Sequence, residues 1–225
     1  NMLKAQGIGK SYGGHTILNN VSLQADAGQC IGIVGVNGCG KTTLLSILAG
    51  ALKADRGKVM LQGKEATGDP SVFASLAAYV PQENPLMEEL TVRDNLFLWY
   101  RGSRQEMERD LEEGPAAMLG IPAMLKKRAA HLSGGMKKRL SIACALSNHA
   151  PLLILDEPGA ALDLECKEEI RCYLGEYVKK GGTVLLASHE MEELSLCSHF
   201  YALRQAELVP IASGLSAREL IDQFR

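Results

Sequence analysis

A glycine-rich loop near the amino terminus constrains this chain more than any other feature. Residues 35–43 read Gly-Val-Asn-Gly-Cys-Gly-Lys-Thr-Thr and match the pattern G-x-x-x-x-G-K-[ST]. The apolar run at 30–34 predicts a buried strand before the loop, and the spacing of leucine and isoleucine after it predicts a helix that stops at Gly50. A strand, a glycine loop and a helix in this order form the context in which the pattern binds phosphate.

The residue types in the loop explain the expected chemistry. Glycines let backbone N–H groups converge on a polyphosphate, because there is no Cβ to clash, and the helix points the positive end of its dipole at the anion. We expect Lys41 to reach the β- and γ-phosphates and the Thr42 hydroxyl to hold Mg²⁺. An ordinary glycine turn is the alternative, and the agreement between loop and flanks disfavours it.

Composition narrows the classes of protein to consider. The 225 residues suffice for one large α/β domain or for a core with an inserted subdomain. A net charge of −2 gives no electrostatic reason to expect nucleic acid or an anionic membrane as a partner. No apolar run approaches the roughly 20 residues that span a bilayer. The six cysteines form no C-x-x-C pair, so we expect reduced, mostly buried thiols of a cytosolic protein.

Strand patterns lie at both ends of the chain and helix patterns lie in the middle. Alternating residues at 2–12 and 15–25, separated by Gly13-Gly14, predict an antiparallel hairpin. Residues 84–149 lose the strand signals and carry helix signals, beginning with Thr91 as an N-cap. The sequence therefore predicts a nucleotide-binding core, 2–83 and 150–225, with a helical insert at 84–149. Further elements are expected as strands at 57–62, 77–80, 152–155, 183–187, 200–203 and 207–211, and a last helix capped by Ser216.

Two carboxylates end the predicted strand at 152–155. Burying Asp156 and Glu157 is costly unless they meet a cation or polar partners. Ligands of a doubly wound sheet collect at the carboxyl ends of its strands, so Asp156 is expected to face the Mg²⁺ held by Thr42. Glu157 is placed to accept a proton from water that attacks the γ-phosphate. Carboxylates that only cap the next helix are the alternative.

Other polar and aromatic residues have two readings each. Gln82 follows the strand at 77–80 and either ligates Mg²⁺ or forms a turn. His189 follows the strand at 183–187 and either donates to the γ-phosphate or is structural. Tyr12 either stacks on a base or is an ordinary strand residue. The charge clusters at 126–128 and 137–139 are expected to be solvated faces rather than a nucleic-acid site.

A second anion-receptive helix start follows the helical insert. Ser133, Gly134 and Gly135 open a predicted helix with apolar residues from Leu140 onward. With this element added, the order of motifs closely resembles the ATP-binding cassette of ABC transporters over about residues 2–215. The resemblance implies an α/β P-loop NTPase with a mainly parallel core sheet, an N-terminal antiparallel β region and an inserted helical subdomain. The motifs that carry it are Tyr12, residues 35–43, Gln82, residues 132–136, residues 152–158, residues 161–163 and residues 188–189.

The resemblance implies a role for each motif residue. Tyr12 would stack on adenine, and Gln82 would contact both Mg²⁺ and the attacking water. Asp156 would bind Mg²⁺, Glu157 would be the general base and His189 the switch histidine. The ATP contacts within one chain would come from Gly35, Asn37, Gly38, Cys39, Gly40, Lys41, Thr42 and Thr43.

The same resemblance implies a dimer and a membrane partner. Ser133, Gly134 and Gly135 would contact the γ-phosphate held by Lys41 of a second copy or of a homologous ATPase subunit, with Asp163 at the seam. ATP hydrolysis would then power transport through a separate integral membrane permease subunit, at the cytoplasmic face of the cell membrane. Residues 89–96 resemble exporters of the drug and polysaccharide type, although similar sequences occur in importers, so export is favoured over import without being decided. A soluble ABC-type ATPase in assembly or cell division is the alternative, and a small-molecule kinase lacks an acceptor site.

Two positions depart from the family pattern. Met136 stands where a glutamine is usual, and Gly159-Ala160 stand where a threonine and a serine or asparagine are common. The second change removes two polar partners near the expected seam between the two chains.

Overall fold

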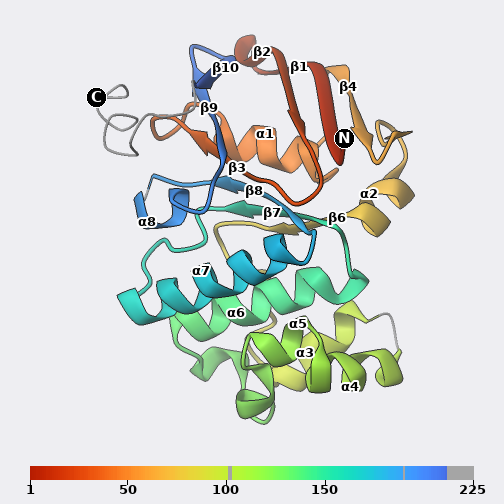
Figure 1. Cartoon of the computed structure of the whole chain (residues 1–225), viewed down its shortest axis with the longest axis vertical. Helices are drawn as coiled ribbons and strands as arrows, with labels where there is room; N and C mark the ends of the chain where they lie inside the picture. The colour runs from red at the N-terminus through yellow and green to blue at the C-terminus, as the bar shows by residue number, and fades with distance from the viewer. Residues whose placement is uncertain (101–102, 190, 212–225) are drawn as a thin grey trace.

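The chain folds into two sheets and several layers of helices (Figure 1). The computed structural model describes residues 1–100, 103–189 and 191–211. The helix expected to begin at Ser216 lies outside the described residues. The α/β P-loop fold expected from the motifs is confirmed, with antiparallel strands at the amino terminus and a mainly parallel core sheet.

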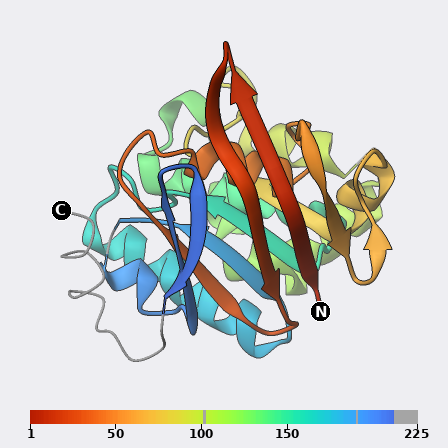
Figure 2. The same ribbon diagram turned by 90° about the horizontal axis from the view of Figure 1, so that it is seen from above.

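The antiparallel sheet has the strand order β2-β1-β4-β5. The predicted hairpin is present, because β1 (Leu3–Tyr12) pairs antiparallel with β2 (His15–Ala25) across the Gly13-Gly14 turn. On its other side β1 pairs with β4 (Arg56–Leu61), which pairs with the two-residue strand β5 (Lys64–Glu65). In Figure 2, which views the molecule from above, β1 and β2 lie in front of the core sheet.

The core sheet has the strand order β10-β9-β3-β8-β7-β6. All neighbours in it are parallel except β9 and β10, which form an antiparallel edge. Every residue of β3, β7 and β8 is buried, as expected for parallel strands covered on both faces. Its strands are β3 (Cys30–Val34), β6 (Ala77–Val80), β7 (Leu152–Asp156), β8 (Thr183–Ala187), β9 (His199–Arg204) and β10 (Glu207–Ile211).

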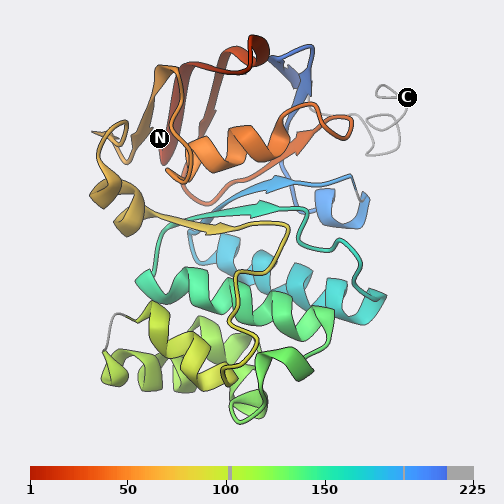
Figure 3. The same cartoon turned by 180° about the vertical axis from the view of Figure 1, so that it is seen from behind.

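Helices cover the two faces of the core sheet. Helix α1 (Lys41–Leu48) lies between the two sheets, where Leu44, Leu45 and Leu48 are fully buried (Figures 1 and 3). Helices α6 (Gly134–Ala145) and α7 (Leu164–Lys179) cover the opposite face. This arrangement places the start of α1 and the carboxyl ends of β7 and β8 at one edge of the sheet.

The described residues between β6 and β7 contain helices and no strand, apart from one isolated bridge between Thr91 and Arg128. Thr91 caps α3 as expected, since its hydroxyl accepts the Asp94 N–H at 3.1 Å. The division into a core and a subdomain at 84–149 stays a prediction. The helices here are α3 (Val92–Trp99), α4 (Arg104–Glu113), α5 (Pro115–Met118), η1 (Ile121–Met124), η2 (Ala129–His131), α6 and η3 (Leu146–Asn148).

The structure also corrects some expectations. Helix α2 (Pro70–Leu76) was not expected, although Asp69 caps it and Pro70 occupies its first turn, which are sequence signals of a helix start. Helix α8 (Met191–Leu194) was not expected either. Of the cysteines, Cys30 and Cys144 alone are buried, so the expectation of mostly buried thiols was wrong, although all six are free.

One charge cluster was also misjudged. Lys138, in the cluster expected to be solvated, is only 2% exposed. The reason is helical spacing, because Lys138 shares a face of α6 with the buried residues Ile142 and Ala145. No described helix combines the length and the apolar character that crossing a membrane requires.

Candidate active site

A polar cleft of about 490 Å³ lies where α1 begins and where β7 and β8 end. It gathers residues that are up to 177 positions apart in the sequence, from Tyr12 to His189. Apart from Ile17, every residue that lines it was a predicted site residue. The lining consists of Tyr12, Ile17, Asn37, Gly38, Gly40, Lys41, Thr42, Thr43, Gln82, Asp156, Glu157 and His189.

The glycine loop joins β3 to α1 in a conformation that only small residues allow. Gly40, the N-cap of α1, has φ +107°, and a Cβ there would lie 2.7 Å from Ile17 Cγ2. Gly35 and Cys39 do not line the cleft. A Cβ on Gly35 would lie 2.6 Å from the Leu203 carbonyl oxygen and 2.7 Å from Cys39 Sγ. Gly35 and Cys39 therefore pack against each other within the loop and do not face the cleft. Their role as nucleotide contacts stays a prediction.

Lys41 is held against its own loop. Its side chain is buried with the residue only 7% exposed, and Nζ donates to the carbonyl oxygens of Gly35 at 2.8 Å and Val36 at 3.3 Å. Carbonyl oxygens satisfy a buried ammonium in part, whereas an anion would also neutralise its charge. The loop therefore presents a cation and converging N–H groups on one wall of the cleft.

A hydroxyl and a carboxylate meet at the floor of the cleft. Thr42 Oγ1 donates to Asp156 Oδ2 at 2.6 Å, and Asp156 is 1% exposed. These are hard oxygen ligands of the kind that Mg²⁺ prefers, with the Gln82 side chain on the same cleft. The described residues contain no cluster of three His, Cys, Asp or Glu side chains suited to a metal. Because Mg²⁺ in nucleotide sites takes one or two protein oxygens plus phosphate and water, the oxygens present fit it.

Glu157 and His189 form a pair at the neighbouring strand ends. His189 Nδ1 lies 2.8 Å from Glu157 Oε2, and the Glu157 N–H donates to the Ala187 carbonyl oxygen at 2.9 Å. Glu157 is 8% exposed, and its backbone is in the left-handed region with φ +48°. Such strain costs about 1–3 kcal/mol and persists where the surroundings impose it, which is common at functional sites.

Tyr12 stands at the rim of the cleft. Its side chain is 48% exposed, and Lys10 Nζ lies 5.4 Å from the centroid of its ring. Lys10 is also paired with Asp55 at 2.8 Å, which fixes the ammonium beside the ring. An exposed aromatic face next to a phosphate-binding loop suits a flat base.

The residues that open α6 lie outside this cleft. Ser133 is the N-cap of α6, where its hydroxyl accepts the Met136 N–H at 3.3 Å, and both Ser133 and Gly134 are exposed. Gly135 is buried, because Cys166 of α7 packs on it. The structure therefore does not bring these three predicted ATP contacts to the cleft of their own chain.

Comparison with known proteins decides the family. A family model described as ABC transporter matches residues 18–160. The chain belongs to this family. It is an ATP-binding cassette of the ABC transporter type.

Relatives of the cassette differ in what their names state. It is 37% identical over 201 residues to the Nod factor export ATP-binding protein I of Rhizobium leguminosarum bv. viciae, covering 88% of this chain and 64% of that protein. It is 35% identical over 221 residues to the ribose import ATP-binding protein RbsA of Halalkalibacterium halodurans, covering 92% of this chain and 44% of that protein. The chain thus spans less than two thirds of the length of these relatives.

Solved structures agree with the fold of the cassette over nearly its whole length. An ATP-binding subunit of an ABC transporter superposes with a TM-score of 0.87 at 26% identity, covering 100% of this chain and 99% of that one. A dimeric ATP-binding cassette in a post-hydrolysis state, bound to ADP and Pi, gives a TM-score of 0.83 at 25% identity, covering 94% of this chain and 100% of that one.

Lys138 is a residue of the cassette that the sequence reasoning missed. Its Nζ donates to the carbonyl oxygens of Pro81 at 3.1 Å and Gln82 at 2.9 Å, next to the cleft. Burial lowers the pKa of Lys138 to about 8, while the charges of Asp156 and Glu193 act in the opposite direction. The spacing of Lys138 with Ile142 and Ala145 was the signal that places it on the buried face.

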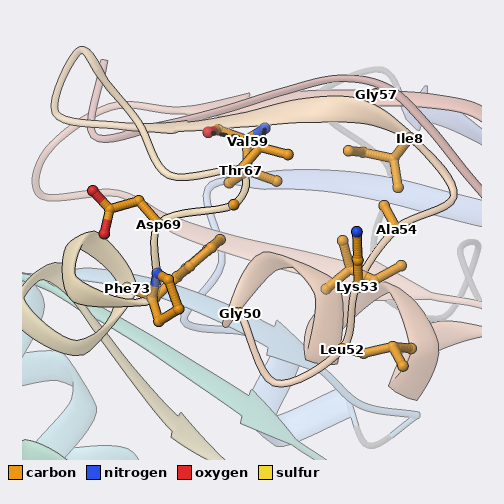
Figure 4. Close-up of a pocket in the computed structure, with 13 residues that line it drawn as sticks. Ile8, Gly50, Leu52, Lys53, Ala54, Gly57, Val59, Thr67, Asp69 and Phe73 are labelled. Atoms are coloured by element: carbon orange, nitrogen blue, oxygen red, sulfur yellow. Dashed lines mark hydrogen bonds between the residues drawn. The ribbon is translucent and has the colours of Figure 1, made fainter.

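A second cavity of the cassette lies at the other end of α1 and has different chemistry (Figure 4). Its volume is about 290 Å³, and its walls include Ile8, Leu52, Val59 and Phe73. Mainly apolar walls suit a polyphosphate poorly, since the anion would lose water without gaining donors. The polar cleft is therefore the candidate site for ATP.

Proposed function

We propose that this cassette is the ATP-hydrolysing subunit of a transporter, which dimerises around two Mg²⁺–ATP complexes and powers transport through separate membrane subunits. The observation that carries the proposal is the arrangement of two adjacent carboxylates. Asp156 bonds the Thr42 hydroxyl, while Glu157, one residue on, turns to His189 at the same end of the sheet. One carboxylate is thus assigned to the metal and the other to a proton.

The first step is nucleotide binding by the loop and the rim. Tyr12 stacks on the base, and the loop N–H groups together with Lys41 bind the phosphates, in exchange for the lysine's bonds to Gly35 and Val36. Thr42, Asp156 and Gln82 would hold Mg²⁺, which would supply positive charge to offset that of the phosphates. All of these groups line one cleft, so no large movement is needed to assemble them.

Proton transfer falls to Glu157. Its carboxylate accepts a proton from the water that attacks the γ-phosphate. The strained backbone and the contact with His189 fix the direction of the carboxylate, which limits the geometries it samples. His189, which is more exposed, donates to the γ-phosphate at the mouth of the cleft.

Dimerisation explains why the start of α6 is exposed. Ser133 and Gly134 present a hydroxyl and a helix terminus to solvent, away from the cleft of their own chain. In a head-to-tail dimer this terminus would meet the γ-phosphate bound by the other copy, or by a homologous ATPase subunit. Loss of that phosphate removes the contacts that favour closure, so the dimer opens.

The membrane subunit would dock on the helical side of the cassette. Leu86, Met87, Leu90 and α3 form our proposed contact, and Met87 and Leu98 are more than half exposed. Docking there would place the cassette at the cytoplasmic face of the cell membrane, with residues 84–149 acting as a subdomain. The net charge of −2 favours a protein partner over nucleic acid.

We propose export as the direction of transport. The sequence of residues 89–96 and the name of the Nod factor export relative support it, whereas the ribose relative bears an import name.

Substitution of Glu157 tests the proposal. Glu157→Gln should retain ATP binding, slow hydrolysis by roughly 10²–10⁴-fold and accumulate an ATP-bound dimer, measured by phosphate release and light scattering with Mg²⁺–ATP. Glu165→Gln, at an exposed position in the first turn of α7, is the matched control. Hydrolysis by Glu157→Gln at the parental rate would refute the assignment of the base.

Copurification tests the coupling to transport. If the cassette serves a transporter, mild detergent extraction should recover it with an integral membrane protein. Recovery with soluble partners alone would favour a soluble ABC-type ATPase in assembly or cell division.

A further inference from the structure

The helix that begins after Ser133 is bonded to the chain segment that carries Gln82. Lys138, in the second turn of α6, donates from Nζ to the carbonyl oxygens of Pro81 and Gln82 at 3.1 and 2.9 Å. These carbonyls lie just past the end of β6, where the chain leaves the core sheet for the helices. One side chain therefore joins α6 to the backbone of a cleft residue.

Two further contacts on the same helix reach the following residues. Ser141 Oγ donates to Asn84 Oδ1 at 3.1 Å. At the surface, Lys137 Nζ lies 2.7 Å from Glu88 Oε1. Helix α6 thus makes three polar contacts with the described segment 81–88, and the Lys138 contact is the one that reaches a residue of the cleft lining, Gln82.

The burial of Lys138 indicates that its hydrogen bonds to the Pro81 and Gln82 carbonyls stabilise the folded structure. The residue is 2% exposed, and taking an ammonium out of water is costly unless its donors are used. Hydrogen bonds to a charged group are about twice as strong as neutral ones, and here both acceptors are backbone atoms of the segment to be positioned. An apolar side chain of similar length would fill the same space without fixing that backbone.

We propose that Lys138 is a positioning residue that fixes Gln82 to the orientation of α6. This rests on the proposed function, in which the start of α6 contacts ATP held by a second chain. When that contact rotates α6, the hydrogen bond from Lys138 moves the Gln82 backbone together with the helix. The Gln82 side chain, which would hold Mg²⁺ and water, moves with its backbone. The occupancy of one ATP site thereby changes the position of Gln82 in the other site through α6. The Gly159-Ala160 loop, which lacks two polar partners common in the family, is not required for this route.

Hydrogen exchange on the nucleotide-free cassette tests the contact itself. Lys138→Met keeps the length and apolar bulk of the side chain and removes the donors, so amide exchange in residues 81–88 should rise about tenfold, while exchange in β7 stays unchanged. Lys137→Met is the matched control, because it removes a partly exposed ion pair to the same segment, and exchange in residues 81–88 of this variant should stay within about twofold of the parent.

Steady-state kinetics test the consequence for catalysis. Lys138→Met should lower kcat about tenfold while KM for ATP stays within about twofold, because Gln82 is displaced and the phosphate loop is intact. Lys138→Gln retains a donor and should recover part of both losses. A folded Lys138→Met with parental exchange in 81–88 and parental kcat would overturn the proposal.

A folding defect does not leave the question open. If Lys138→Met does not fold, Lys138→Leu, which also lacks a donor, is measured in the same way, and parental exchange in 81–88 in a folded Lys138→Leu would equally overturn the proposal. A parental cassette without ATP hydrolysis would refute the proposed function, whereas the exchange experiment would still decide whether Lys138 holds the segment.

Discussion

The Thr42 hydroxyl donates a 2.6 Å hydrogen bond to the buried carboxylate of Asp156, across 114 positions of the sequence. The bond joins the first turn of α1 to the end of β7. It sets two oxygen ligands side by side, so a metal that binds between them and the phosphates needs little reorganisation. The relationship leads to a direct test.

Thr42→Val and Asp156→Asn should each weaken the binding of Mn²⁺ in the presence of a non-hydrolysable ATP analogue by at least about tenfold, as read from the EPR signal of free Mn²⁺. Because the two groups act on one ion, the double variant should lose less than the sum of the two free-energy changes. Ser46→Ala, on α1 with its hydroxyl against Tyr79, is the control. Strictly additive losses would contradict a shared site.

His189→Ala should reduce kcat by roughly 10²-fold, because Glu157 loses the partner that orients its carboxylate. Nucleotide affinity should fall by less than about tenfold, because the loop and Lys41 still bind the phosphates after the histidine contact to the γ-phosphate is lost. Binding is measured with a fluorescent ATP analogue and hydrolysis by phosphate release. His199→Ala, an exposed histidine at the start of β9, should match the parent in both. A parental kcat in His189→Ala would show that the pair is not used.

Gly135→Ala should destabilise the fold by about 1–3 kcal/mol, since the new Cβ would lie 2.1 Å from Cys166 Sγ. Urea unfolding gives the change. Cys166→Ala in the same chain should recover part of the loss, and only part, because the Cys166 Cβ would lie 2.6 Å from the new atom. If the double variant gained nothing over Gly135→Ala, the steric reason for this glycine would be wrong.

Tyr100→Phe should cost about 1–3 kcal/mol of stability and leave kcat unchanged. Its hydroxyl donates to Asp110 Oδ2 at 2.5 Å, and both residues are buried. Burial and the Asp110 carboxylate raise the pKa of Tyr100 well above its usual range, so the hydroxyl stays a donor at any pH at which the protein is handled. Thermal unfolding is the measurement, with Tyr201→Phe in β9 as the control. An unchanged Tm would mean that water replaces the lost donor.

Local patterns were sufficient where a short segment decides its own structure. The loop at 35–43, the hairpin at Gly13-Gly14 and the cap at Thr91 depend on residues that are neighbours in sequence, so their signals are readable in order. The motif order also led to the family, which the family match confirms. The roles assigned to the individual site residues stay predictions.

Packing between distant segments required the structure. The sequence around position 138 does not predict that the Lys138 ammonium contacts the carbonyls of Pro81 and Gln82, because these acceptors lie 57 and 56 positions away in the chain. The strain at Glu157 and the contact of Cys166 with Gly135 are likewise imposed by neighbouring elements. The sequence by itself determined which groups can bind phosphate, metal and proton. The tertiary structure decided which of them meet, because burial and hydrogen bonding act between side chains that only folding brings together.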